Sequence, residues 1–285
     1  MKALVIDISK CNGCHNCQIA CKDEHVGNDW TPYAKPQPIV GQFWNKVTDV
    51  TRGTVPKVKV AYTHSICQHC DDAPCITACP QKAIYKREDG IVIIHPEKCA
   101  GNRNCNDACP YEGVIYFNRD LNISQKCTFC AHLLDKGWKV PRCVDVCPTG
   151  ALTFGDEDDF GDLLNKAEPL LPEFSTKPRV HYIGLPKRFI AGAVFDPEKD
   201  ECIEGARITI TDNQTGEKRS TLSDDFGDFW VEDLKVSTFS LLIEKEGRPA
   251  KEIQSIRTDK DVNLGDIELR DKDKTPPAGK WQRQS

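Results

Sequence analysis

The placement of the cysteines constrains this chain more than any other feature. Of 16 cysteines in 285 residues, 15 lie between Cys11 and Cys147, and the remaining one is Cys202. The first cysteine comes too early for a secretory signal peptide to precede it, and no apolar run approaches the roughly 20 residues of a membrane helix. We therefore expect a cytoplasmic chain with no direct membrane insertion, whose reduced thiols are free to bind metal. Export on a partner's signal peptide stays open.

These cysteines form an internal repeat of four runs. Cysteines at i, i+3 and i+6 in a tight loop can bind three corners of one iron–sulfur cube, and a fourth, after three intervening residues, points away and serves a neighbouring cluster. Such runs therefore work in pairs. The four runs are Cys11-x2-Cys14-x2-Cys17-x3-Cys21, Cys67-x2-Cys70-x4-Cys75-x3-Cys79-Pro80, Cys99-x5-Cys105-x3-Cys109-Pro110 and Cys127-x2-Cys130-x12-Cys143-x3-Cys147-Pro148.

Two other uses of cysteine fit this pattern less well. Zinc sites also use Cys-x2-Cys pairs, but they take four ligands as two separated pairs and do not need triplets followed by Cys-Pro. A disulfide framework is disfavoured by the chain length and by the expected compartment. The pattern therefore predicts cubane-type iron–sulfur clusters.

The third run departs from the repeat. Its second cysteine would fall at position 102, where the sequence has Asn102, which cannot act as a thiolate. This site either loses one iron and holds a [3Fe–4S] cluster, or holds a [4Fe–4S] cluster with a non-cysteine ligand, or holds no cluster.

The rest of the chain has a different pattern. From residue 188 short stretches of alternating polarity, separated by Gly- and Asp-rich turns, predict six or seven strands of a small β-sandwich. We expect an α+β chain with a cluster domain at residues 1–155, a linker at 156–187, the sandwich at 188–270 and a polar tail at 271–285.

At this point the cysteine runs resemble a known family. Their order, and the long gap of run four between Cys127-Thr-Phe-Cys130 and Pro141-Arg-Cys143, are similar to the iron–sulfur subunits of the dimethyl sulfoxide reductase family of molybdopterin enzymes. The resemblance implies a tandem bacterial-ferredoxin-like domain and a catalytic large subunit with a molybdenum or tungsten pterin. It also implies that run one pairs with run four, and run two with run three.

The resemblance gives a ligand set for each cluster. Three sites would be [4Fe–4S] clusters, and the fourth lacks a cysteine at Asn102, as does the nitrate reductase iron–sulfur subunit, which holds a three-iron cluster. The implied ligands are Cys11, Cys14, Cys17 and Cys147 for cluster 1; Cys21, Cys127, Cys130 and Cys143 for cluster 2; Cys67, Cys70, Cys75 and Cys109 for cluster 3; and Cys79, Cys99 and Cys105 for cluster 4.

A narrower resemblance is to the small subunits of pyrogallol–phloroglucinol transhydroxylases. It rests on residues 22–30, 85–92 and 177–180 and on a C-terminal transthyretin-like or Cna-B-like sandwich. It implies an electron-transfer subunit of an enzyme acting on hydroxylated aromatic compounds, whether a transhydroxylase, a hydroxylase or a dehydroxylase. The three cysteines kept in run three depart from the transhydroxylases and favour a net redox reaction. The alternatives are a free-standing polyferredoxin and clusters that serve mainly as structural staples.

Other residues receive a plainer interpretation. The net charge of −5 shows no excess of basic charge for nucleic acid, and no catalytic constellation is present. Cys202 is interpreted as a buried or idle thiol. His15 and His69 are interpreted as solvated loop residues, with tuning of cluster potentials as the alternative. The insertion at 35–45 is either a partner-binding surface or an ordered loop with aromatic anchors.

Overall fold

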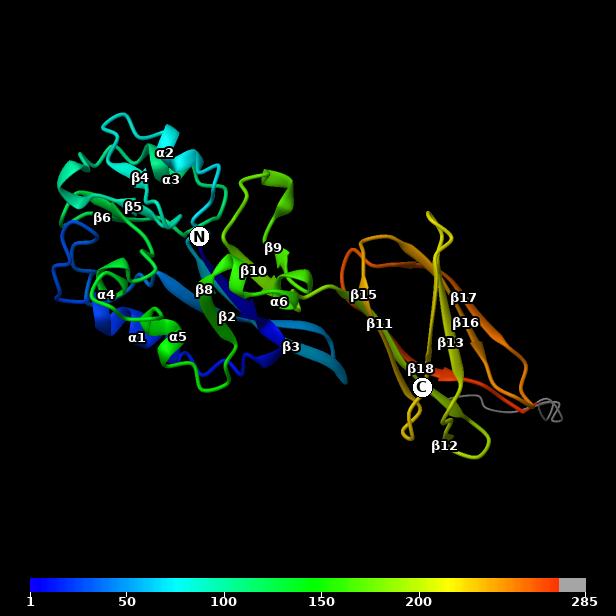
Figure 1. Cartoon of the computed structure of the whole chain (residues 1–285). Coiled ribbons are helices and arrows are strands. Elements are labelled where there is room, and N and C mark those ends of the chain that lie inside the picture. The colour runs from blue at the N-terminus through cyan, green and yellow to red at the C-terminus, as the bar shows by residue number, and fades with distance from the viewer. Residues whose placement is uncertain (272–285) are drawn as a thin grey trace, which may run out of the picture. The chain divides into compact units, whose positions relative to one another are not determined.

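The computed structural model describes residues 1–271 and divides the chain into two compact units. Unit 1 contains residues 1–50 and 60–185, and unit 2 contains residues 51–59 and the chain from 186 onward (Figure 1). No helix within residues 1–271 is long and apolar enough to cross a membrane. The polar tail predicted at 271–285 lies, apart from Asp271, outside the described residues.

Unit 1 is organised around a four-stranded sheet in the order β8-β1-β10-β9. The central strand β1 pairs antiparallel with β8 and parallel with β10. Its residues 3–6 are all buried, as expected of a strand covered on both faces. The strands are β1 (Lys2–Asp7), β8 (Leu152–Asp156), β9 (Glu168–Pro169) and β10 (Val180–Ile183).

Three hairpins and several short helices complete this unit. The hairpins are β2 (Asn45–Thr54) with β3 (Lys57–Ile66), β4 (Ile84–Lys86) with β5 (Val92–Ile94), and β6 (Tyr116–Asn118) with β7 (Ile123–Gln125). The α-helices are α1 (Asn16–His25), α2 (Pro74–Thr77), α3 (Asn104–Ala108), α4 (Ala131–Leu134), α5 (Arg142–Asp145) and α6 (Asp162–Asn165). The 3-10 helices are η1 (Ile8–Lys10), η2 (Pro96–Lys98), η3 (Glu157–Asp159) and η4 (Pro172–Phe174).

The cysteine loops turn sharply into these helices through residues with positive φ. His15 (φ 60°) precedes α1, and Arg103 (φ 64°) precedes α3. The left-handed conformation reverses the chain within one residue, so the loop before it can wrap around a compact object. Gly13 adds a close approach, because a Cβ atom there would lie 2.3 Å from the ring of Tyr62.

The segment predicted as a linker at 156–187 is largely part of unit 1, and this is a correction. Residues up to Leu185 belong to that unit, because β10 pairs with β1 over Leu4 to Asp7. The prolines that suggested an extended connection interrupt this segment without separating it from the sheet. The sequence pattern could not show this, since the partner strand of β10 lies at the other end of the unit.

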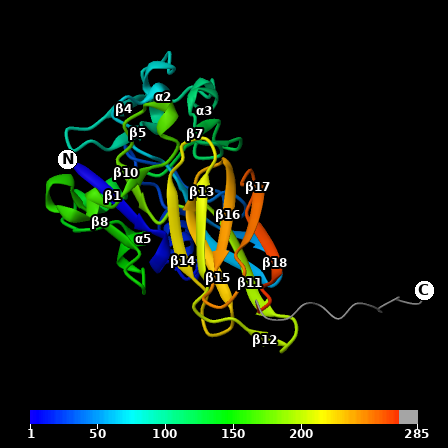
Figure 2. The same ribbon diagram turned by 90° about the vertical axis from the view of Figure 1, so that its right-hand side faces the viewer.

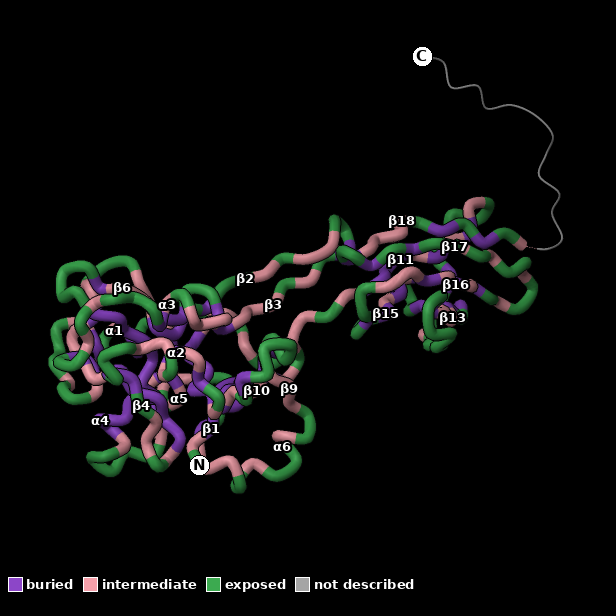
Figure 3. Tube along the Cα trace, turned by 90° about the horizontal axis from the view of Figure 1, so that it is seen from above, coloured by how far each residue is buried: buried purple, intermediate pink, exposed green. Residues whose placement is uncertain are grey.

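Unit 2 is a β-sandwich, whose strands Figure 2 shows. In one sheet β11 pairs with β12, β15 and β18, and in the other the order is β14-β13-β16-β17. Alternate residues such as Ile208 and Ile210 are buried between the sheets, and Figure 3 marks the buried positions. The strands are β11 (Arg188–Asp196), β12 (Glu201–Cys202), β13 (Arg207–Asp212), β14 (Lys218–Leu222), β15 (Asp228–Leu234), β16 (Thr238–Glu244), β17 (Lys251–Arg257) and β18 (Val262–Glu268).

Two features of unit 2 differ from the sequence expectation. Within residues 188–268 the structure has the eight strands β11 to β18, where the sequence pattern predicts six or seven; the charged residues of the edge strand β17 hide the alternation that marks a half-buried strand. The tip of the β2–β3 hairpin, residues 51–59, belongs to this unit rather than to the cluster domain. There Arg52 reaches the buried side chain of Asp261, and Lys57 pairs with Asp228.

Candidate metal centre

The helices of unit 1 bring the four cysteine runs together in two pairs. Cys17 and Cys21 lie on α1, Cys143 on α5, Cys75 on α2 and Cys105 on α3. Because α1 packs against α5 and α2 against α3, run one lies beside run four and run two beside run three (Figure 1). This is the run pairing that the family resemblance implies.

Group 1 comprises Cys11, Cys14, Cys17 and Cys147. Burial raises the pKa of Cys17 to about 12, and the thiols of Cys11, Cys147 and Cys14 add to this effect, so these four side chains lie close together. Cys14 is exposed, and Cys11 and Cys147 are half-buried, so the group reaches the surface. The ring of His64 borders it, with Nε2 3.6 Å from Cys11 Sγ.

Group 2 comprises Cys21, Cys127, Cys130 and Cys143, all of which are buried. Burial raises the pKa of Cys143 well above its usual range, and the thiols of Cys130, Cys127 and Cys21 add to this effect. Thiols packed so closely cannot ionise together without a cation among them. Bound iron would supply that positive charge, and a thiol that coordinates a metal ion is deprotonated outright.

Group 3 surrounds a cavity with about 350 Å³ of space not filled by atoms. The sulfur ligands predicted for cluster 3 all line this cavity, together with the side chains of His69 and Lys126. Burial raises the pKa of Cys109 to about 11, with Cys67 and Cys70 as further causes. The four cysteines of this group are Cys67, Cys70, Cys75 and Cys109.

Group 4 comprises Cys79, Cys99 and Cys105. Burial raises the pKa of Cys105, and the thiols of Cys99 and Cys79 contribute, so the three lie together. Asn102 is exposed in the same loop. Its amide nitrogen donates to Gln81 Oε1, and its Oδ1 accepts a hydrogen bond from the backbone N–H that opens α3. The asparagine therefore keeps the loop in shape without a thiol.

The groups follow one another in a line. Group 1 adjoins group 2, since Cys17 and Cys21 share α1 and both raise the pKa of Cys143. Group 2 adjoins group 3, since Cys67 is the thiol that most raises the pKa of Cys127, after burial itself. Group 3 adjoins group 4 through the packing of α2 on α3. The order along this line is 1-2-3-4.

The polar atoms around the groups fit a bound cluster. Lys126 is 2% exposed, and its Nζ donates to the carbonyls of Val92 and Cys127. A buried ammonium without a carboxylate partner costs free energy unless anions lie nearby, and thiolates of groups 2 and 3 supply them. Within residues 1–271 no three His, Cys, Asp or Glu side chains converge on a single metal ion. In a cubane cluster each thiolate would bind a different iron atom, so the cysteine sulfur atoms need to lie farther apart than the ligands of a single metal ion.

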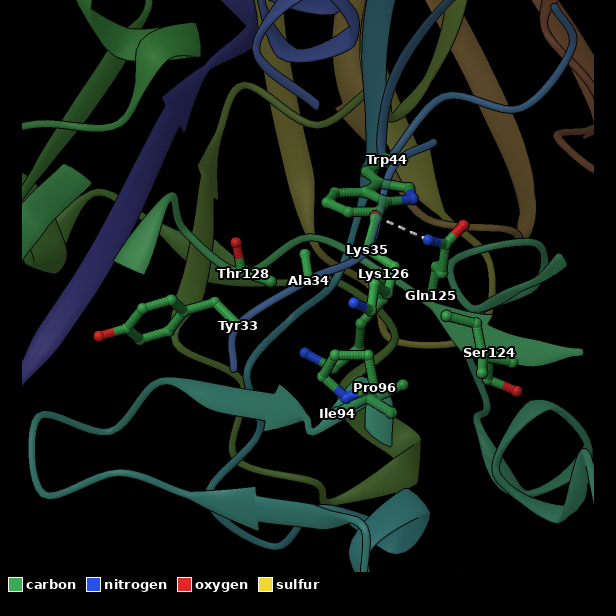
Figure 4. Close-up of a pocket in the computed structure, with 11 residues that line it drawn as sticks. Tyr33, Ala34, Lys35, Trp44, Ile94, Pro96, Ser124, Gln125, Lys126 and Thr128 are labelled. Atoms are coloured by element: carbon green, nitrogen blue, oxygen red, sulfur yellow. Dashed lines mark hydrogen bonds between the residues drawn. The ribbon is translucent and has the colours of Figure 1, made fainter. Parts of the chain in front are cut away.

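A second, smaller cavity of about 240 Å³ lies on another side of Lys126 (Figure 4). Three parts of the chain meet around it: the insertion at 35–45 and the residues just before it, with Tyr33 and Trp44; the end of β5 with Ile94; and the chain at 123–128. Gln125 donates to the backbone carbonyl of Lys35, which anchors the insertion here (Figure 4). The insertion is therefore ordered, and Trp44 is one of its buried anchors.

Sequence reasoning missed several side chains that border the groups. His64 lies far from the first run in sequence, and Lys126 looks like an ordinary surface lysine until the fold buries it. His69 was interpreted as solvated, but it is fully buried, so that interpretation is wrong. Its position between two cysteines of one loop was the available signal. Cys202 lies exposed on β12 in unit 2.

Comparisons with known proteins agree with this geometry. A family model described as a 4Fe-4S dicluster domain matches residues 58–157, and one described as a carboxypeptidase regulatory-like domain matches residues 190–270. The pyrogallol hydroxytransferase small subunit of Pelobacter acidigallici is 36% identical over 278 residues, covering 93% of this chain and 98% of that protein.

Two further relatives match the cluster-binding part. The arsenate respiratory reductase iron-sulfur subunit of Shewanella sp. is 35% identical and covers 63% of this chain and 94% of that protein. One subunit of the anaerobic dimethyl sulfoxide reductase of Escherichia coli is 38% identical and covers 61% of this chain and 84% of that protein. The predicted fold class and iron–sulfur binding are confirmed. The chain belongs to the family of iron–sulfur electron-transfer subunits of dimethyl sulfoxide reductase-type molybdopterin enzymes.

Proposed function

We propose that this chain is the electron-transfer subunit of a complex whose large subunit carries a molybdenum or tungsten pterin and acts on hydroxylated aromatic compounds. Groups 1, 2 and 3 each hold a [4Fe–4S] cluster. Group 4 holds a fourth cluster, either [3Fe–4S] or [4Fe–4S] with a non-cysteine ligand. Catalysis belongs to the large subunit, and the complex works in the cytoplasm.

The observation that carries this proposal is the linear order of the four groups. The cysteines of group 2 are all buried, whereas Cys14 of group 1 and Asn102 of group 4 are exposed. Clusters bound at these sites supply one-electron transfer, with potentials set by the surrounding hydrogen bonds, charges and solvent exposure. An arrangement with two exposed ends suits transfer between two partners.

The chain's own residues separate the inner groups from water. The ring of Phe129 is 1% exposed, stacks on His69 and meets Phe154 edge-on with ring centroids 5.3 Å apart. Lys126 adds a buried positive charge beside groups 2 and 3. The positive charge would favour the more negative, reduced form of whatever these thiolates bind, whereas the exclusion of water would favour the less charged, oxidised form.

The substrate class comes from one relative. The match to the Pelobacter protein extends through the sandwich, whereas the arsenate and dimethyl sulfoxide relatives cover only 63% and 61% of this chain. The name of that protein refers to transfer of a hydroxyl group on pyrogallol. Retention of Cys79, Cys99 and Cys105 in group 4 favours a partner enzyme with net redox chemistry, such as a hydroxylase or dehydroxylase.

Anaerobic purification of the tagged chain from its native host tests the proposal. We expect a large subunit to co-purify with molybdenum or tungsten, and the complex to turn over pyrogallol or related phenols. The isolated chain should show no turnover. Recovery of the chain alone, fully loaded and exchanging electrons with small diffusible proteins, would instead indicate a free-standing polyferredoxin.

Serine substitutions test the ligand assignment. Cys143→Ser, Cys75→Ser and Cys105→Ser should each remove or alter one cluster signal in electron paramagnetic resonance (EPR), because each changes a ligand in a different group. Cys202→Ser is the matched control, since Cys202 is exposed in unit 2. Loss of iron in that control would contradict the assignment.

A further inference from the structure

His69 occupies an unusual position inside a cysteine loop. It stands between Cys67 and Cys70, adopts φ 45° and has no exposed surface. The backbone N–H of Val92 lies 3.1 Å from its Nδ1. A backbone N–H can only donate, so Nδ1 is the acceptor nitrogen and the proton of the neutral ring sits on Nε2.

The Nε2–H group has no hydrogen-bond partner among residues 1–271. A buried donor without an acceptor costs free energy, and such groups in native proteins normally meet an acceptor. His69 lines the cavity of group 3 together with all four cysteines of that group. An acceptor held in that cavity would satisfy the donor.

The chain contains its own comparison for this residue. Phe129 has the same place between Cys127 and Cys130, with φ 50°, and its ring stacks on His69 with centroids 3.8 Å apart. In both loops the backbone N–H of this residue points to the sulfur of the first cysteine, at 3.5 Å for His69 and 3.3 Å for Phe129. The two loops match in backbone, and only one of them offers a ring N–H.

We propose that the Nε2–H of His69 donates a hydrogen bond to a sulfur atom of the cluster held by group 3 and thereby raises its reduction potential. The inference rests on the cluster sites of the proposed function. The sulfur atoms of a cluster held there would carry more negative charge in its reduced form, so they would accept the hydrogen bond from His69 more strongly in that form. No covalent bond forms or breaks, and the proton stays on Nε2.

Potentiometric EPR on the loaded complex tests this role. His69→Phe copies the loop of Phe129, keeps a stacked ring and removes the N–H. We expect the midpoint potential of one cluster to fall by about 59 mV. For a one-electron couple, this corresponds to a tenfold decrease in the equilibrium constant for reduction. His181→Phe is the control, because it makes the same exchange at a half-buried histidine of β10 that does not line the cavity of group 3, so this midpoint should hold.

Two measurements keep the outcome decisive. Cys75→Ser shifts or removes one EPR signal and so identifies the group 3 cluster; if no signal responds, the cluster site of the proposed function fails. A loaded His69→Phe complex with unchanged midpoints, or a shift in a different cluster, overturns only the role of His69.

If His69→Phe does not load its clusters, wild-type protein with ¹⁵N-labelled histidine provides the test. Pulsed EPR should show nitrogen coupling and an exchangeable proton at this cluster, and their absence overturns the inference.

Discussion

Arg179 donates two parallel hydrogen bonds to Asp71, from Nε to Oδ1 at 2.8 Å and from Nη2 to Oδ2 at 2.7 Å. Its Nη1 also donates to Glu157, and the guanidinium is 3% exposed. The backbone of Asp71 bonds to the carbonyl of Lys177. Run two and the segment at 156–185 are therefore joined by side chains as well as backbone, next to the cavity of group 3.

Replacing Arg179 should destabilise unit 1. Arg179→Met leaves Asp71 with Lys86 as its ion-pair partner. Because the carboxylates are about one-third exposed, we expect a loss of about 2–3 kcal/mol, below the range for fully buried pairs. Thermal unfolding of the loaded protein measures it. Lys177→Met is the control, since its pair with Asp72 is exposed and should contribute much less to stability. Equal losses in the two variants would contradict this account.

Asn102→Cys should convert the cluster held by group 4 from a three-iron to a four-iron cluster. With three cysteines and no fourth thiol, a [3Fe–4S] cluster is the simplest outcome, and it should give an oxidised EPR signal that disappears on mild reduction. Asn102→Cys should replace that signal with one from a four-iron cluster and raise the iron count by about one per chain.

Asn102→Ala is the matched variant for group 4, because it removes the oxygen that accepts the N–H of Asn104 and offers no ligand for iron. An intact three-iron signal there would show that loop shape alone does not change the cluster. Alkylation of Cys99 and Cys105 under native conditions, with iron for only three clusters, would show that group 4 is empty.

Arg52→Ala should weaken the sandwich of unit 2. Arg52 donates to the carbonyl of Lys187 at 2.6 Å and lies 3.4 Å from the buried carboxylate of Asp261. In Arg52→Ala the carboxylate of Asp261 would lose this partner and keep the hydrogen bond from the N–H of Phe189. We expect the free energy of unfolding to fall by about 1–3 kcal/mol. Calorimetry of the full chain measures it, with exposed Arg257→Ala as control.

The isolated segment 188–269 should still fold as a β-domain but melt below the full chain, since it lacks the hairpin tip at 51–59. Circular dichroism and thermal melting of that segment measure both expectations. A disordered spectrum would show that the tip is required for folding, and an unchanged melting temperature would show that the tip contributes nothing.

The insertion at 35–45 presents a candidate surface for the large subunit. Ile39 and Val40 are 82% and 80% exposed, whereas Gln37 and Trp44 anchor the loop from inside. Deleting the whole loop would remove these anchors, so Ile39→Asp with Val40→Asp is the cleaner test. We expect weaker co-purification with clusters intact. Val236→Asp, on an exposed residue of unit 2, is the control. Unchanged assembly would place the interface elsewhere.

Acid should destabilise unit 1 through its buried histidines. Burial lowers the pKa of His25 to about 4, below the usual value of 6.5; the hydrogen bond to the backbone of Cys21 opposes this effect, and the charge of His132 adds to it. The unfolded chain therefore binds more protons between these values, and stability falls as pH drops from 6.5 to about 4. As the pH is lowered through this range, the melting temperature should decline less steeply for His25→Phe than for the wild-type protein. An identical slope in both proteins would assign the acid sensitivity to other groups.

The chemistry and number of the cysteine runs could be predicted from the sequence, because each run is one continuous stretch of the chain, such as Cys11–Cys21 or Cys127–Cys147. The sandwich could be predicted as well, since alternation from Phe189 to Phe195 or from Thr238 to Glu244 is visible strand by strand. Asn102 could be singled out in the same way, as a break in a local repeat.

The contacts between the runs could be seen only in the folded chain. The order of the four groups depends on packing between α1 and α5 and between α2 and α3, whose partners are far apart in sequence. The burial of His69 and Lys126 depends on loops that close over them from other runs. The segment at 156–185 looked like a linker because its pairing partner, β1, begins at Lys2. Non-local contacts of this kind leave no periodic trace in the residues that make them.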